Sequence, residues 1–392
     1  MTGGAARPDL ARLVRQLRDR EFPWTAATTY LNNAAIGPLP ERTRLVLEAF
    51  NARRTAPHLL PDRELMAMQA EARAAAGALI GASPDEIALV PNTSVGLNVA
   101  ARALPLEPGE IVLVSDREFP ANVYPWLALR DRGVSAELAP VTAAGWPDED
   151  RLLERLADPR VRVLAVSMVQ FSTGFRADLD RLSAACRANG AWLVVDAIQG
   201  LGHCPLDVRD TPVDVLATGG QKWLLSPWGS GFVYVRRELI ERMTPAHVGW
   251  MSFEGTDDFT SLLDYADALR ADARRFEVGT VATQDVMAMT TSLGLIRELG
   301  VEAISAWTCA LSEPLLAWAD RRCVRVVSPR DGVHRCGIVC LAPDDARDAH
   351  RRLKAAGVVC AFREGAIRFS PHAYNTPEEM EKVVEVLDGV IS

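Results

Sequence analysis

The stretch at residues 211–235, TPVDVLATGGQKWLLSPWGSGFVYV, decides the fold. Its two apolar runs, Val213–Ala217 and Gly231–Val235, are short, rich in β-branched residues and bounded by glycine and proline, which is typical of buried strands. Between them stands Lys222, one of only three lysines in the chain. An amine among small and aromatic residues loses hydration, which lowers its pKa and makes it a nucleophile. The alternative is a lysine that extends to solvent at a strand end.

A second buried strand lies upstream and ends in a carboxylate. Residues 191–195, AWLVV, form a continuous apolar run, typical of a parallel strand buried on both faces, and Asp196 follows directly. In open α/β sheets, the edge formed by the carboxyl ends of the strands faces the crevice in which ligands bind. A buried carboxylate and a buried amine on neighbouring strand ends suit pyridoxal 5'-phosphate (PLP), because Lys222 forms a Schiff base while Asp196 pairs with the pyridinium nitrogen. The alternative is an aspartate that caps the next helix.

Further motifs stand at both ends of the chain, at Tyr30–Pro40 (YLNNAAIGPLP) and Ile367–Glu379 (IRFSPHAYNTPEE). With Asp196 and Lys222 they resemble the class V aminotransferases, fold-type I PLP enzymes that include cysteine desulfurases, isopenicillin N epimerase-like proteins and kynureninases. The resemblance covers nearly the whole chain. It implies an α/β fold with a large, mostly parallel-sheet cofactor domain and a smaller α+β domain. We assign residues 25–270 to the large domain, and residues 1–24 and 271–392 to the small one.

Composition agrees with a large enzyme and excludes other classes. The 392 residues are 48% hydrophobic, enough for an extensive core, and the formal charge of −8 argues against a nucleic-acid partner. No signal peptide or long apolar span is present, so membrane insertion and secretion are not expected. The seven cysteines lack metal-ligand spacing, which indicates reduced thiols, a cytoplasmic location and no metal site.

Several residues are candidates to hold the cofactor. Pro91–Gly96 (PNTSVG) joins a strand to the helix expected over Leu97–Leu104, and free N–H groups at a helix start attract anions, although most such sequences only cap the helix. Phe119 stands where desulfurases carry the histidine that stacks on the pyridine ring. It would hold the ring without offering a proton, unless it is plain core. The resemblance further implies cofactor contacts from Thr93, Ser94, Gln199 and Gln221, and from Thr280, whose counterpart in relatives reaches the phosphate of the partner subunit in a homodimer.

The expected substrate contacts centre on Arg368. An arginine between Ile367 and Phe369 in a strand is hard to explain as core, and it matches the family arginine that clamps the substrate α-carboxylate. A planar guanidinium meets a carboxylate through two hydrogen bonds. Asn32 and Asn33, which could be simple turn residues, and Trp250 are the other substrate-binding candidates.

The reaction is less constrained than the cofactor. Desulfurases carry a long loop with a nucleophilic cysteine before the carboxylate-binding arginine, whereas Val358–Gly365 leaves room for only a tight turn, and Cys360 stands in an apolar run. We therefore expect β-elimination through an external aldimine on Lys222. This is a C–S lyase reaction of specialised metabolism, resembling members of lincosamide pathways. The alternatives are an aminotransferase or decarboxylation-coupled oxidative deaminase, an epimerase, and a non-catalytic binding module with the same fold.

Overall fold

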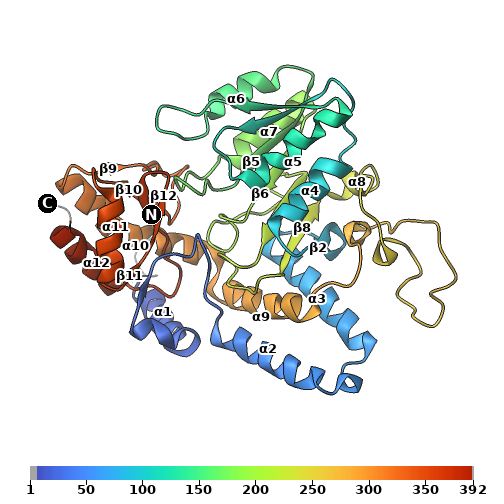
Figure 1. The fold of residues 1–392 in the computed structure, drawn as a ribbon, viewed down its shortest axis with the longest axis horizontal. Helices are drawn as coiled ribbons and strands as arrows, with labels where there is room; N and C mark the ends of the chain where they lie inside the picture. The colour runs from blue at the N-terminus through green and yellow to red at the C-terminus, as the bar shows by residue number, and fades with distance from the viewer. Residues whose placement is uncertain (1–6, 391–392) are drawn as a thin grey trace.

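Strands and helices alternate around a seven-stranded sheet in a computed structural model, which describes residues 7–390 (Figure 1). The strand order is β2-β8-β7-β6-β5-β3-β4. Strand β8 runs against both of its neighbours, and the β7-β6-β5-β3-β4 series is parallel throughout, so the expected mostly parallel sheet is confirmed. The strands are β2 (Ile87–Leu89), β3 (Ile111–Ser115), β4 (Ser135–Ala139), β5 (Val161–Ser167), β6 (Trp192–Asp196), β7 (Val215–Gly219) and β8 (Gly231–Val235).

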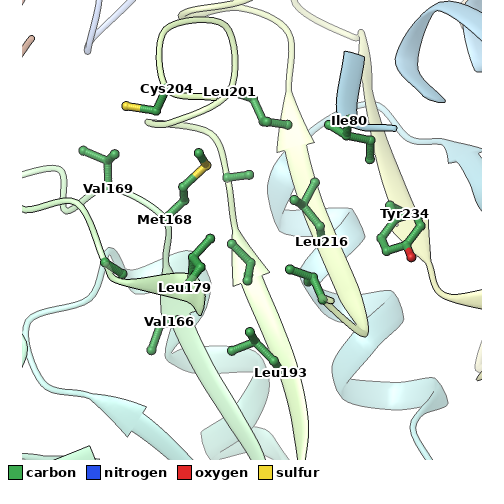
Figure 2. Packing of buried hydrophobic residues seen from close by; sticks show 14 of the residues in the cluster. Ile80, Val166, Met168, Val169, Leu179, Leu193, Leu201, Cys204, Leu216 and Tyr234 are labelled. Atoms are coloured by element: carbon green, nitrogen blue, oxygen red, sulfur yellow. The ribbon is translucent and has the colours of Figure 1, made fainter. Parts of the chain in front are cut away.

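Helices cover both faces of this sheet. Because successive strand residues point to opposite faces, each central strand contributes to two separate cores. Leu193 and Leu216 join a core with Ile80 and Leu179 of the helices on one face, as Figure 2 shows. On the other face, Val194 and its neighbours pack against α4 and α5. The helices of the first face are α3 (Asp62–Ile80), α6 (Glu149–Leu156), α7 (Leu179–Asn189) and α9 (Thr283–Leu299), and those of the second are α4 (Thr93–Ala103), α5 (Tyr124–Leu127) and α8 (Arg237–Ile240).

A smaller antiparallel sheet lies beside the large one, at the left of Figure 1. Its order is β12-β13-β10-β9, and α10, α11 and α12 supply its core. Where the chain divides into domains stays a prediction, and residues 1–6 and 391–392 of the proposed small domain lie outside the described residues. The elements are β9 (Arg325–Val326), β10 (Val339–Ala342), β12 (Ala361–Arg363), β13 (Ala366–Phe369), α10 (Val301–Arg321), α11 (Ala346–Ala355) and α12 (Pro377–Val390).

The N-terminal segment ties the two sheets together. Strand β1 (Thr29–Tyr30) pairs in parallel with β11 (Val358–Val359) of the C-terminal region, and Asn32 forms a bridge to Ser370.

Among residues 7–390, none of the helices combines the length and the hydropathy that crossing a bilayer requires. The remaining α-helices among the described residues are α1 (Arg7–Glu21) and α2 (Glu41–Arg54).

A buried ion pair fastens α3 to the large sheet. Arg73 Nε and Nη2 donate to Glu277 Oε1 and Oε2 at 3.0 and 2.5 Å, and Glu277 Oε1 also accepts from the Leu89 backbone N–H at 2.8 Å. Both side chains are nearly inaccessible to solvent. We predict that Arg73→Met lowers the free energy of unfolding by about 3–5 kcal/mol, because it leaves the Glu277 carboxylate buried without its counter-ion.

Urea denaturation measures this difference. The matched control is Arg53→Met, since Arg53 pairs with Glu64 on an exposed surface and its loss should cost less than about 1 kcal/mol. Equal losses from both variants would contradict a special role for the buried pair.

Candidate active site

Lys222 lies in a tight turn at the end of β7. The Gly220 backbone N–H donates to Ser230 O at 2.8 Å, and Ser226 N–H donates to Gly220 O at 2.9 Å. Leu225 has a φ of 52°, a left-handed conformation that costs a non-glycine residue free energy and that clusters at functional sites. The turn is therefore held in a single shape that projects Lys222 from the carboxyl edge of the sheet.

Asp196 and Lys222 come from neighbouring parallel strands, as the sequence predicts. Asp196 ends β6 in register with Ala217 of β7, and its side chain is buried. Burial raises the pKa of Asp196 to about 6, against the opposing effects of the Ile198 N–H and of Lys222. Burial lowers the pKa of Lys222 to about 8, while Asp196 acts in the opposite direction. Near neutral pH, a larger share of Lys222 is thus a neutral amine than in an ordinary lysine.

Phe119 presents a flat face beside the lysine. Lys222 Nζ lies 5.8 Å from the centroid of the Phe119 ring. The Phe119 side chain is 45% exposed, and the edge of the nearby Phe171 ring supports it at a centroid distance of 5.3 Å. An aromatic residue with one open face next to a reactive amine fits the predicted stacking on a heterocyclic ring.

The start of α4 forms a cradle for an anion. The helix begins at Thr93 rather than at the predicted Leu97, because Asn92 Oδ1 accepts from the Val95 N–H at 3.0 Å and caps the helix there. Thr93 Oγ1 is buried and has no partner among the described residues. A methyl group on Gly219 would lie 2.4 Å from Gln221 Oε1 and 3.3 Å from Thr93 Oγ1, so these three residues converge.

A phosphate group fits this cradle. An orphaned hydroxyl, an amide side chain and the free N–H groups of a helix start offer hydrogen bonds to an anion, and Ser94 stands exposed beside them. Gln221 and Thr93 are therefore well placed to hold the phosphate of PLP, while the Phe119 face and Asp196 suit its ring.

Arg368 is a buried guanidinium without an acidic partner among the described residues. It is 2% exposed, donates from Nη1 to Phe171 O at 2.6 Å, and its buried Nε has no partner there. Burial lowers the pKa of Arg368 to about 10. Its charge also lowers the pKa of Lys222, which places it electrostatically close to the amine. An unpaired, dehydrated guanidinium is a strong site for a carboxylate.

Some predicted residues are engaged in the protein itself. Gln199 donates from Nε2 to Ala34 O at 2.9 Å and accepts from Trp223 Nε1 at 2.9 Å, so it links the N-terminal segment to the lysine turn. Asn33 is fully buried and donates to Tyr374 Oη at 2.8 Å. The Oδ1 atoms of Asn32 and Asn33 have no partner within residues 7–390. A cofactor role for Gln199 and substrate roles for the two asparagines stay predictions.

Trp250 and Thr280 lie elsewhere. Both line a cleft of about 560 Å³ that also includes Met66 and Phe259 but none of the residues around Lys222. Within one subunit the structure therefore does not bring them together with the other candidates.

Among the described residues, no cluster of three or more His, Cys, Asp or Glu side chains is arranged to hold a metal ion.

Three contributors to the site were not predicted. Glu118 is a buried carboxylate directly before Phe119. His372 accepts from the Ala373 N–H at Nδ1, and its Nε2 lies 3.1 Å from Trp223 O, so its ring contacts the turn that carries Lys222. Gly37 donates to Gln221 O at 2.9 Å, and a Cβ there would lie 2.1 Å from Lys222 O. Gly37 and His372 lie within the quoted sequence motifs and Glu118 directly precedes the predicted Phe119, but the partners of all three are distant in sequence.

The depressed pKa of Lys222 predicts how the apoenzyme takes up PLP. Only the neutral amine attacks an aldehyde, so borohydride-reducible incorporation should rise through about pH 8 and level off above it. Lys222→Ala should form no reducible link. Lys354→Ala is the control, because Lys354 and Lys382 are exposed on α11 and α12. Peptide mapping of the label to either of those lysines would contradict the assignment.

Comparison with known proteins agrees with this geometry. A family model described as aminotransferase class-V matches residues 29–383. An uncharacterised aminotransferase of Bacillus subtilis, YcbU, is 33% identical over 307 residues, which are 78% of this chain and 80% of that protein. A probable cysteine desulfurase of Methanothermobacter thermautotrophicus is 28% identical over 404 residues, covering 95% of this chain and 96% of the relative.

Solved structures share the fold over nearly the full length. The apo cysteine desulfurase of Thermococcus onnurineus superposes with a TM-score of 0.84 at 23% identity, covering 100% of this chain and 99% of that one. The cystine C–S lyase C-DES, solved with its product cysteine persulfide, gives a TM-score of 0.86 at 23% identity, covering 95% of this chain and 100% of that one. The chain therefore belongs to the class V aminotransferase family of α/β enzymes, with pyridoxal 5'-phosphate as its cofactor.

Proposed function

We propose that this enzyme is a lyase that cleaves the C–S bond of an S-substituted cysteine by β-elimination. One observation carries the proposal: among the described residues, the cysteines near Lys222, Asp196 and Arg368 are buried, so no exposed thiol lies beside this set. Two cysteines lie near Arg368 in the small sheet: Cys340 pairs with it across β10 and β13, and Cys360 directly precedes β12, and both are buried. Burial raises the pKa of each thiol to about 12. Neither can serve as a thiolate that carries sulfur away.

The side chains divide the work of binding and proton transfer. Arg368 binds the substrate α-carboxylate, which fixes the Cα–H bond relative to Lys222. PLP, when bound, withdraws electrons from Cα of the amino acid that is joined to it. The freed Lys222 amine, with its depressed pKa, takes the Cα proton as general base. Asp196 keeps the ring nitrogen protonated, and Phe119 holds the ring in place without competing as an acid.

The proposed elimination balances in electrons and in atoms. The electron pair of the Cα–H bond ends in a Cα–Cβ double bond, and the pair of the C–S bond leaves with sulfur as a thiol after protonation. With one water, an S-substituted cysteine gives a thiol, pyruvate and ammonium. The hairpin of β12 and β13 turns at Glu364 and Gly365, so a two-residue turn stands where a desulfurase-type reaction would need a long loop that carries a cysteine.

The names of a fold neighbour and of several sequence relatives both support a reaction at a C–S bond. The fold neighbour C-DES is named a cystine C–S lyase, and several relatives are named probable cysteine desulfurases. Both names concern C–S bonds, and the buried thiols here favour the lyase over the persulfide-forming route. A role in specialised metabolism rests only on the resemblance to lincosamide-pathway members.

Transamination is the second candidate. The relative YcbU is named an aminotransferase, and the same lysine, aspartate and arginine would serve that reaction. Transamination would leave the amino group on the cofactor, oxidative deamination would release CO₂, and epimerisation would invert Cα. A non-catalytic module would bind PLP without turnover.

We further propose that the active unit is a homodimer. Trp250 and Thr280 line a cleft that contains none of the residues around Lys222, and both side chains are exposed. In a dimer, each residue can reach the cofactor site of the partner subunit. A dimer of this kind explains why Trp250 and Thr280 lie away from Lys222 of their own subunit.

Arg368→Lys should raise the KM for amino-acid substrates by about 10- to 100-fold, since a charged hydrogen-bond pair is worth about 1.5–3 kcal/mol. The matched control is Arg335→Lys. Arg335 also has a buried, unpartnered Nε and donates to a backbone carbonyl, Cys309 O, but it pairs with Glu313 and has no contact with the lysine turn. Steady-state kinetics compare the two, and an unchanged KM in Arg368→Lys would contradict the assigned role.

Product analysis tests the reaction itself. With S-methylcysteine and related substrates, the wild type should release pyruvate and a thiol in equal amounts, and Cys360→Ala should retain most of this activity. Accumulation of the amino form of the cofactor with a keto acid product would instead support transamination. Loss of turnover in Cys360→Ala, with a persulfide on Cys360 of the wild type, would refute the lyase proposal.

A further inference from the structure

Glu118 is a buried carboxylate for which the proposed reaction has no use. It follows β3 through a turn in which Arg117 has a φ of 62°, a left-handed conformation that a non-glycine residue adopts at a cost. This turn sends consecutive side chains in opposite directions. Glu118 is 5% exposed, whereas Phe119 is 45% exposed beside Lys222.

Four donors converge on the Glu118 carboxylate. The Ser167 N–H donates to Oε1 at 2.9 Å, and the Ser167 hydroxyl donates to Oε2. Gln170 Nε2 donates to Oε1 at 2.5 Å, and Asn122 Nδ2 donates to Oε2 at 3.3 Å. Among the described residues no cation pairs with Glu118, so these donors are what hold the buried carboxylate in place.

Two of the three partner residues, Ser167 and Gln170, lead to residues of the active site. Ser167 ends β5 in register with Asp196 of β6. Gln170 precedes Phe171, whose carbonyl accepts from Arg368 at 2.6 Å and whose ring supports Phe119. Glu118 therefore joins three segments: the one that carries the Phe119 ring, the end of β5 beside Asp196, and the Gln170–Phe171 segment, whose carbonyl accepts from Arg368.

A carboxylate suits this place better than a neutral amide. Glu118 meets three side-chain or backbone N–H groups and one hydroxyl, and an ionised carboxylate offers only acceptors to them. A glutamine at position 118 would replace one of the two acceptor oxygens by an NH₂ group, which would then face two hydrogen-bond donors. Burial and the neighbouring Asp196 raise the pKa of Glu118 to about 7, while the hydrogen bonds from Ser167 and Asn122 act in the opposite direction.

We propose that Glu118 is a positioning residue of the cofactor site, which holds Phe119, the Asp196 strand end and the Phe171 carbonyl in one rigid unit and supports the positive charge of the lysine-linked cofactor. The inference rests on the cofactor site and not on the reaction. Its test therefore uses PLP binding and absorbance, which do not depend on which substrate the enzyme takes.

Glu118→Gln is the decisive variant. The Kd for PLP should rise at least about tenfold, because a charged network of hydrogen bonds loses its acceptor. The visible absorbance band of the PLP-loaded enzyme, titrated with pH, should shift its midpoint to lower pH. The sign follows because Glu118 interacts electrostatically with Asp196 beside the site, and removing its negative charge disfavours the protonated, positively charged lysine–cofactor link.

Glu149→Gln is the matched control. Glu149 is also a buried carboxylate of the large sheet region and accepts from a backbone N–H, that of Asp178, at 2.8 Å, but it contacts no candidate site residue. This variant should lower the melting temperature without moving the Kd or the titration midpoint. If Glu118→Gln behaves in the same way, with only stability affected, Glu118 is merely structural and the proposal is overturned.

A second variant covers a failure of Glu118→Gln to fold. Ser167→Ala keeps the carboxylate and removes one donor to it. A Kd for PLP raised about threefold or more, with a shifted titration midpoint, supports the proposal, and unchanged values overturn it. A wild type that binds PLP but releases no thiol would refute the lyase and leave these measurements intact.

Discussion

Burial of two ionisable groups at the same edge of the sheet is the constraint on which this structure depends. Taking the Asp196 carboxylate and the Lys222 amine out of water disfavours the charged form of each, which is why their pKa values move toward one another. A site of this kind costs stability, and the surrounding structure must hold it in place. The mostly parallel sheet does so by ending two apolar strands side by side, with Asp196 in register beside β7.

Support for the lysine turn comes from an aromatic column behind it. The Trp223 ring stacks on His203 at 3.6 Å and on His372 at 5.6 Å, and His372 stacks on Tyr374 at 5.9 Å between ring centroids. Burial lowers the pKa of His372 to about 3, so the imidazole is neutral and acts as a packing and hydrogen-bonding group. Tyr374 continues the column to Phe22 of the N-terminal segment at 4.6 Å. The reactive amine is thus braced by residues from three distant parts of the chain.

The sequence predicted the elements whose residues carry a local signal. Strands β6 and β7 were predictable because they are continuous apolar runs that end in Asp196 and before Lys222. Strand β4, Ser135–Ala139, was missed, because SAELA is half exposed at the sheet edge and has low strand propensity. The start of α4 was placed four residues late, because a glycine follows the capping residues and hides the first turn.

Within the site, the sequence indicated residue types but not their partners. Lys222, Asp196 and Arg368 were recognisable because a lone charge in an apolar run needs an explanation. Glu118 gave no such signal, since its partners Ser167 and Gln170 lie 49 and 52 residues away. Gln199 was expected at the cofactor, yet its two hydrogen bonds to protein could not be foreseen without the turn that carries Trp223.

The tight turn at Glu364 and Gly365 has an evolutionary consequence. Both residues are exposed, both have positive φ, and nothing lies within 4 Å of the space above Gly365. Lengthening a surface loop costs only about 0.6 kcal/mol for each doubling, so this hairpin could accept an inserted segment with little change to the core. An insertion bearing a cysteine would bring a mobile thiol to the arginine side of the site. If the proposed lyase reaction holds, release of a free thiol and capture of sulfur by the protein differ by the length of one surface turn, and a lineage can pass from one to the other without rebuilding the fold.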